Sequence, residues 1–206
     1  GETNSFGSYN SFDLTVNDQI YALPFYVDTL GLFYNKDLFN TAGITRPPVT
    51  WNELNDDVKK LTQYDQAGNI LRSGIAMGTA RNVNRSTDIL SLLMLQSGVQ
   101  MTDDAGTRAT FAERVQGQAV GDIALQYYTD FANSAKEVYS WNNQKNYSTD
   151  AFAGGNAAMM VNYSHAIYDV RDKSPKLNFS VAPIPQPLGA SKAVTYANYW
   201  APTVSK

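Results

Sequence analysis

The sequence predicts an α/β domain whose mixed, mostly parallel sheet is flanked by helices. Apolar runs typical of strands alternate with helical patterns through most of the chain. The 206 residues are also enough to bury a large core, since a chain of this length removes on the order of 70 % of its unfolded surface from water. There is no cysteine, so disulfides and thiolate metal sites are excluded.

The N-terminal part is expected to form a β-hairpin followed by a buried strand. Phe12–Val16 and Gln19–Leu23 alternate in polarity around the turn pair Asn17–Asp18, and Pro24 is expected to end the second strand. The apolar and aromatic run Thr29–Tyr34 predicts the buried strand.

Two helices with recognisable ends come next. Lys36–Ala42 is followed by Gly43, which suits a left-handed helix cap. Thr50 and Glu53 have the spacing of a capping box, in which the hydroxyl and the carboxylate each accept an otherwise unpaired backbone N–H. The apolar positions of this second helix have helical spacing: Trp51, Leu54, Val58 and Leu61.

The rest of the chain alternates the two kinds of element. A polar turn is expected at 65–69 and a polar loop at 79–86. Helices are expected at Thr87–Gln96, Gln118–Lys136, Ser148–Phe152 and Ser164–Arg171, the second with Ile123, Tyr127, Tyr128 and Phe131 near one face. Strands are expected at Gly74–Met77, Ala157–Val161, Phe179–Ala182 and Ala193–Trp200.

Charge and hydropathy argue against nucleic-acid binding and against a membrane-spanning helix. The net charge is -3 at pH 7, without the clustered basic residues that a nucleic-acid backbone requires. Apolar stretches such as Ile89–Leu95 are far shorter than the ~20 residues of a membrane-spanning helix.

Catalytic, cofactor and metal motifs are not recognisable. His165 is the only histidine, and no Gly-x-Ser-x-Gly elbow accompanies it. Gly154–Gly155 lacks the Gly-Lys-Ser/Thr of a phosphate loop. The carboxylates of Asp56–Asp57 and Asp103–Asp104 are adjacent in sequence and do not face each other, and no zinc or calcium spacing is present. We therefore expect neither an enzyme nor a metal or cofactor site.

A sugar site is the chemistry that remains. Aromatic faces stack on the apolar C–H faces of sugars, and Asp, Asn and Arg side chains bind the hydroxyl groups. Such residues fall in short connectors, and the candidate ligand contacts are Tyr26, Asp28, Arg81, Asn82, Asn162, Tyr163, His165, Tyr199 and Trp200, with the rest of the Arg81–Arg85 loop and Asn198 nearby.

Five segments, in order, resemble the extracellular solute-binding proteins of bacterial ABC sugar importers, the family that includes maltose-binding protein. The first and longest is Tyr21–Phe39 (YALPFYVDTLGLFYNKDLF). The others are Ala42–Ile44 with Pro47–Leu54 (PPVTWNEL), Asp150–Asn162 (DAFAGGNAAMMVN), Val181–Pro185 and Tyr199–Lys206.

The resemblance implies one lobe of a periplasmic-binding-protein-like fold, in a protein that closes two lobes over a sugar by a hinge. It implies a leading hairpin and first crossing strand at 1–28, the second lobe at 29–192 and a second crossing strand at 193–206, in a chain that covers part of the family's length. It also implies export to the periplasm or cell surface, lipid anchoring in the full-length protein, and a membrane permease as partner.

Residues carried over from the resemblance lie near the two crossings and after one strand. Asp28 falls where the family often places a polar ligand contact. His165 falls where sugar binders often place a stacking aromatic, and Tyr199 and Trp200 lie near the family's aromatic at the second crossing. Two alternatives stay open: a truncated lobe that serves as a protein-interaction module, and a glycan-processing enzyme, which would need a carboxylate pair ~5–10 Å apart.

Overall fold

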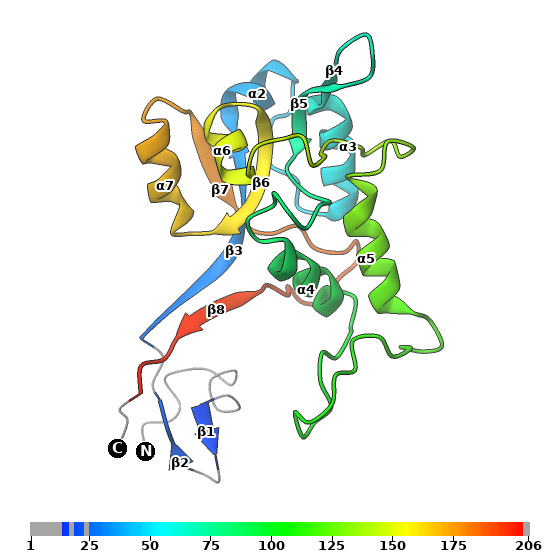
Figure 1. Ribbon diagram of the computed structural model, residues 1–206, viewed down its shortest axis with the longest axis vertical. Coiled ribbons are helices and arrows are strands. Elements are labelled where there is room, and N and C mark those ends of the chain that lie inside the picture. Colours follow the sequence, from blue (N-terminus) through cyan, green and yellow to red (C-terminus); the bar gives the residue numbers. More distant parts are fainter. Residues whose placement is uncertain (1–13, 17–18, 23–24, 204–206) are drawn as a thin grey trace. The chain divides into compact units, whose positions relative to one another are not determined.

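A computed structural model describes residues 14–16, 19–22 and 25–203 (Figure 1). Internal contacts divide the chain into a smaller unit, residues 1–29 with 197–206, and a larger unit, residues 30–196. The chain therefore passes from one unit to the other twice, at 29–30 and at 196–197. The lobe boundaries expected at 28 and 192 stay a prediction.

The smaller unit consists of short antiparallel pairs. Strands β1 (Thr15–Val16) and β2 (Gln19–Ile20) pair as the predicted hairpin. The first part of β3 (Tyr26–Asn35) pairs with β8 (Ala197–Trp200), which is shorter than the strand expected from residue 193. The expected strand ends at 12–13 and 23, the turn at 17–18 and the proline at 24 lie outside the described residues.

The larger unit is built on a sheet in which β6 (Ala157–Tyr163) is central. The strand order is β4 (Gln63–Tyr64), β5 (Ile70–Ile75), β6, β3 and β7 (Phe179–Ala182), as Figure 1 shows. Every residue of β6 is buried. A strand buried on both faces reads as a continuous apolar run, as the Ala-Ala-Met-Met-Val segment does.

The sheet is mixed and flanked by helices, as predicted, but "mostly parallel" is wrong. Only β5 and β6 pair in parallel among the described strands, whereas β3 is antiparallel to β6, β7 and β8, and β4 is antiparallel to β5. Alternating strands and helices give a parallel sheet only where each crossover joins neighbouring strands that run the same way. Here β3 lies between β6 and β7 and runs against both.

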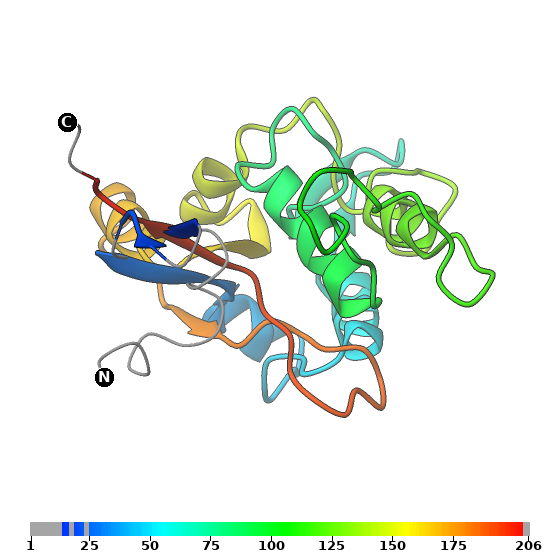
Figure 2. The same cartoon turned by 90° about the horizontal axis from the view of Figure 1, so that it is seen from below.

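The helices form two groups, which both views show apart (Figures 1 and 2). One group is α3 (Trp51–Leu61), α4 (Ser86–Gln96) and α5 (Val120–Asp130), and the other is α6 (Ser148–Ala153) with α7 (Ala166–Lys173). Helix α2 (Lys36–Thr41) lies near β7. The described helices include none that is both long and apolar enough to cross a bilayer.

The ends of α2 and α3 follow the sequence signals, with one difference. Gly43 follows α2 with a φ of 71°, and the Thr50 hydroxyl accepts the Glu53 backbone N–H at 3.2 Å, both as predicted. The Glu53 carboxylate, however, accepts the Val49 N–H at 2.8 Å and pairs with Arg46, so the capping box is only half formed.

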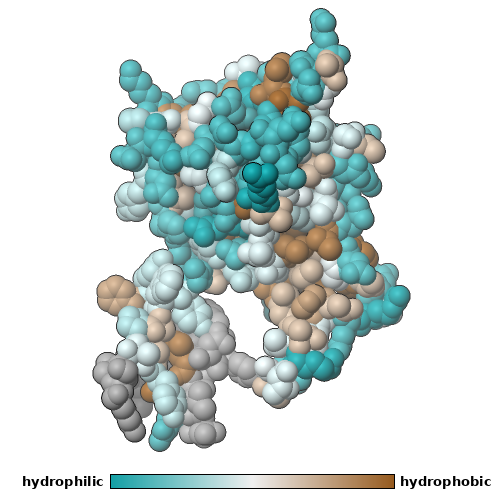
Figure 3. All heavy atoms as spheres, in the orientation of Figure 1, coloured by the Kyte–Doolittle hydropathy of each residue, from teal (hydrophilic) through white to brown (hydrophobic). Residues whose placement is uncertain are grey.

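The helix expected at Gln118–Lys136 is shorter than its sequence pattern, since α5 spans Val120–Asp130. Helix α5 ends at Asp130, because the next residue, Phe131, turns into the core and its carbonyl accepts the Ser140 and Trp141 N–H groups. Ile123, expected near the buried face, is 57 % exposed, whereas Ala124 of the same helix is buried. A hydrophobic patch lies over the region of α4 and α5 in Figure 3, while most of the face around it is hydrophilic.

Strand β5 lies directly against α3 at Gly74. A Cβ atom at this glycine would lie 2.6 Å from the Val58 carbonyl oxygen and 2.7 Å from the Thr62 hydroxyl. The Gly74 N–H donates to that hydroxyl at 3.1 Å, so the contact is also hydrogen-bonded. The glycine therefore lets the helix approach the sheet closely enough to close the core.

Gly74→Ala should destabilise the protein by about 1–3 kcal/mol, because backbone atoms of α3 must move to accept the methyl group. Urea unfolding would measure the loss. Leu71→Ala, at a 59 % exposed position of the same strand, is the control and should change stability by less than about 0.5 kcal/mol. Equal effects of the two substitutions would contradict the close-approach argument.

Asp57 is a buried carboxyl on helix α3. It is 8 % exposed and lines a pocket of about 220 Å³ that also contains Arg46, Glu53 and Lys60. Burial raises the pKa of Asp57 to about 6, and the nearby Lys60 charge only partly opposes this. The folded protein thus holds the Asp57 proton up to a higher pH than the unfolded chain does.

Because the pKa is higher in the folded state, stability should fall as pH rises through about 4 to 6, and the penalty should be complete above that window. Asp57→Asn should therefore stabilise the protein by roughly 1–3 kcal/mol at pH 7.5 and by much less at pH 4.5. The exposed neighbour Asp56 supplies the control, Asp56→Asn. Urea unfolding at both pH values would test this, and a gain that does not depend on pH would contradict it.

Candidate ligand-binding site

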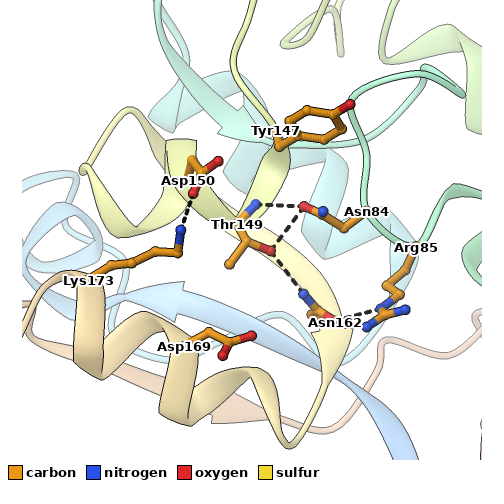
Figure 4. A pocket seen from close by; sticks show the side chains of 8 residues that line it. All are labelled: Asn84, Arg85, Tyr147, Thr149, Asp150, Asn162, Asp169 and Lys173. Carbon is orange, nitrogen blue, oxygen red and sulfur yellow. Dashed lines mark hydrogen bonds and ion pairs between the residues drawn. The ribbon is translucent and has the colours of Figure 1, made fainter.

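A polar pocket of about 350 Å³ lies in the larger unit (Figure 4). Its volume falls within the range of small-ligand sites, about 300–1,000 Å³. Amide, hydroxyl and charged side chains dominate its lining, together with one tyrosine ring. The lining residues are Asn84, Arg85, Tyr147, Thr149, Asp150, Asn162, Asp169 and Lys173.

Four segments supply this lining, and chain topology brings them together. The loop that follows β5 supplies Asn84 and Arg85, the start of α6 supplies 147–150, and the end of β6 supplies Asn162. Strands β5 and β6 are parallel, so the loop after β5 and the last residues of β6 lie at the same sheet edge. Helix α7, which follows β6, supplies Asp169 and Lys173.

Asn84 caps α6 from a distant part of the sequence. No side chain within α6's own start accepts its first N–H groups. The Asn84 Oδ1 instead accepts the Thr149 N–H at 3.1 Å, the Thr149 hydroxyl at 3.0 Å and the Ser148 hydroxyl at 2.8 Å. The Ser148 oxygen accepts the Asn84 N–H in return, at 3.0 Å. The reciprocal bonds fix the loop to the helix.

Asn162 extends this network to Arg85. Its Nδ2 donates to the Thr149 hydroxyl at 3.1 Å, and its Oδ1 accepts the Arg85 Nε–H at 3.0 Å and the Tyr163 N–H at 2.8 Å. The asparagine is 3 % exposed at the end of the central strand. A buried amide with three protein hydrogen bonds orients Arg85, and the dashed lines of Figure 4 show its bonds to Thr149 and Arg85.

Arg85 also lies over an aromatic layer. Its guanidinium carbon is 5.1 Å from the centre of the Tyr163 ring, which stacks on the His165 ring with 5.9 Å between centres. The Arg85 Nη2 lies 3.4 Å from His165 Nε2. Burial, with a smaller contribution from Asp88, raises the pKa of Tyr163, so this ring stays uncharged.

The other charges of the pocket are on the helices. Lys173 pairs with Asp150 at 2.6 Å, and both side chains are about half exposed. Asp169 is exposed and near Lys173. Arg85 forms no ion pair with any residue that the structure describes. Fewer than three His, Cys, Asp or Glu residues come together anywhere in the described ranges, so those ranges offer no metal cluster of that kind.

Five of the predicted contacts lie in the larger unit, in different settings. Asn162 lines the pocket, and Tyr163 and His165 form the adjoining layer. Arg81 is exposed outside the lining. Asn82 is 4 % exposed, and its amide donates to the Asn142 and Lys145 carbonyls while accepting from Trp141 and Thr79. These four bonds use the full capacity of the Asn82 amide.

The other four predicted contacts lie in the smaller unit. Tyr26 is paired opposite Trp200, and the two are 43 % and 65 % exposed. Residues directly opposite in an antiparallel pair share a face, as do residues two apart, so Asp28 lies on that face too. Tyr199 projects from the other face of the pair. Their part in ligand binding stays a prediction.

Sequence reasoning predicted both helices of the site but missed the residues with which they line the pocket. Tyr147, Thr149 and Asp150 begin α6, and Asp169 and Lys173 are four residues apart on α7. The sequence held no signal for this, because Ser148, Thr149 and Asp150 are residue types that cap helices, and only the structure shows that α6 has no side-chain cap of its own.

Asn84→Ala should destabilise the protein by about 1–2 kcal/mol, because the Thr149 N–H and the Ser148 and Thr149 hydroxyls lose their acceptor. Asn84→Asp keeps an acceptor oxygen at the same place and should retain most of the stability. Chemical denaturation of both variants would measure the difference. If Ala and Asp cost the same, the capping role would be wrong.

Comparison with solved structures gives the class of fold: it is shared with binding proteins that hold a small solute. The maltose-bound MalE3 of T. maritima superimposes with a TM-score of 0.68 and is 25 % identical; the match covers 97 % of this chain and 49 % of that one.

The family follows from the sequence. Residues 3–206 match the family described as bacterial extracellular solute-binding protein, and the chain belongs to it. This family consists of binding proteins, not of enzymes. The assignment confirms the resemblance that the five segments indicate.

Two curated relatives show how much of a family member this chain covers. The maltodextrin-binding protein MdxE of Bacillus subtilis is 29 % identical over 197 residues, which are 89 % of this chain and 41 % of MdxE. The mannitol-binding protein of Pseudomonas aeruginosa is 28 % identical over 165 residues, 78 % of this chain and 35 % of that protein. The chain thus spans well under half the length of these relatives.

Proposed function

We infer that this chain is the ligand-binding part of a carbohydrate receptor that serves an ABC-type importer. The observation that carries this is the polar pocket at the sheet edge of a chain that belongs to the solute-binding family. Its amides and hydroxyls suit the hydroxyl groups of a sugar or polyol, and the 54 % exposed ring of Tyr147 offers a stacking surface.

The relatives support the same ligand class. MdxE is named for maltodextrin and the Pseudomonas protein for mannitol, and the MalE3 structure holds maltose. Mono- and oligosaccharides and polyols present many hydroxyl groups, which the amide, hydroxyl and charged side chains of the pocket can bind.

The proposed mechanism is hinged closure in the full-length protein. A ligand that contacts both lobes stabilises the closed state, which then docks on the membrane permease. The two neighbouring crossings support a hinge, because Thr29 pairs with Ala197 and the Leu30 N–H donates to the Tyr196 carbonyl at 3.0 Å. The proposal places the protein outside the cytoplasmic membrane and leaves lipid anchoring as an expectation. No observation favours the interaction-module alternative.

Calorimetric titration with mono- and oligosaccharides and mannitol tests the function. Saturable binding is expected, and Tyr147→Ala should weaken it by about tenfold, the effect of one lost aromatic contact. Tyr168→Ala is the matched control, because Tyr168 is 78 % exposed and does not line the pocket.

The controls separate three outcomes. If both tyrosine variants bind like the parent, the ligand site lies elsewhere. If His165→Ala and Trp200→Ala weaken binding while Tyr147→Ala does not, the ligand binds at the residues predicted from the sequence and not in the pocket. If neither this chain nor the full-length protein binds any sugar or polyol, the carbohydrate function is wrong.

A further inference from the structure

One cation of the pocket, Arg85, has no counter-ion among the residues that the structure describes. Among the described residues no carboxylate pairs with Arg85, whereas Lys173, the other cation of the lining, is neutralised by Asp150 at 2.6 Å. Arginine stays charged at any pH that proteins tolerate. A half-buried guanidinium without a carboxylate partner is a natural binding group for an anion.

The contacts that hold Arg85 leave part of its donor set available. A guanidinium has five N–H groups. One, on Nε, donates to Asn162, and Nη2 lies 3.4 Å from His165 Nε2. Both Nη1 hydrogens and one on Nη2 remain. The outer edge of the group can therefore bind the two oxygens of a carboxylate or phosphate together.

The network also orients Arg85 before any ligand arrives. Asn162 is fixed by Thr149 and by its own buried position, and the Tyr163 ring supports the flat face of the guanidinium. A charged group held in place loses little conformational entropy on binding, so its contribution to affinity is large for its size. An arginine that only packs against the surface would not need this support.

The remaining charges place the anion at one side of the pocket. Figure 4 shows Arg85 across the pocket from Lys173, with Asp169 on the same helix as Lys173. The Asp169 carboxylate repels an anion near α7, and Asp150 already occupies Lys173. The neutral part of a ligand would then lie along Tyr147 and Thr149.

We propose that the site selects an anionic carbohydrate: a sugar or sugar acid whose carboxylate or phosphate binds Arg85 while its hydroxyl groups bind the amides. This rests on the proposed carbohydrate function and narrows it. Asn162 is a positioning residue in this scheme, because it acts by holding Arg85.

The test is calorimetry at pH 7 with matched ligands: D-galactose, D-galacturonate, D-galactose 1-phosphate and D-galactosamine, and the corresponding glucose series. We expect an acidic sugar of at least one series to bind about 10- to 100-fold more tightly than its neutral parent, the usual effect of a charge-assisted hydrogen-bond pair. Uronates and sugar phosphates in separate arms identify which anion is preferred.

Variants of Arg85 then assign the preference to this residue. Arg85→Gln should abolish the preference, so that this variant binds the acidic sugar and its neutral parent with affinities that agree within about threefold. Arg85→Lys should keep part of the preference, since it keeps the charge and loses the two-pronged geometry. Arg114→Gln, which removes the same charge from an exposed loop outside the lining, should retain the preference.

The inference is wrong if the neutral parent or the amino sugar binds as tightly as the acid. It is also wrong if Arg85→Gln weakens binding of the acid and of the neutral sugar equally, or if inorganic phosphate binds as tightly as the sugar phosphate. Binding of neutral sugars without any preference for acids would reject the inference and leave the carbohydrate function standing. Absence of binding to every sugar, by this chain and by the full-length protein, would reject both.

Discussion

The start of α6 sets the constraint on which the site depends. The first N–H groups of a helix have no acceptor inside the helix, and leaving them buried and unpaired costs about 1–3 kcal/mol each. Helix α6 has six residues and no cap of its own, so the loop after β5 supplies Asn84. Because Asn84 must lie against α6, the next residue in the chain, Arg85, is brought to the end of β6.

Burial then turns this placement into a rigid arrangement. Asn162 is on the last part of a strand in which every side chain is buried, so its amide needs partners and finds them in Thr149, Arg85 and the Tyr163 N–H. Each partner lies on a different segment. The same hydrogen bonds that satisfy one buried amide thus fix the relative positions of the loop, the helix and the strand that line the pocket.

Local signals in the sequence were sufficient to predict most helices and strands, but not to predict which strands pair or in which direction they run. Gly43, Thr50 and the apolar spacing of α3 fix helix ends and a buried face through contacts a few residues apart. Strand direction depends on which strands become neighbours, and nothing local to β3 shows that it lies between β6 and β7. The end of α5 was missed for a similar reason, because the Phe131 carbonyl bonds to Ser140 and Trp141.

The site was predictable in the same uneven way. Asn162, Tyr163 and His165 were expected from their position after an apolar strand. The different roles of Asn82 and Asn84, in contrast, depend on partners about 60 residues away. Both are asparagines of one polar loop. Only the fold separates the one whose amide is consumed in the interior from the one that lines the pocket.

The proposed anion site would also give closure a physical basis for discrimination, because no carboxylate among the described residues pairs with Arg85. In the proposed two-lobe mechanism, closing over the pocket removes water from the guanidinium. Burying an uncompensated charge costs several kcal/mol, so the closed state is disfavoured while the pocket holds only water or a neutral solute. An anionic sugar removes that cost and adds hydrogen bonds. Because a ligand shifts an equilibrium only by its differential affinity for the two states, the same arginine that selects the ligand would also couple its binding to closure.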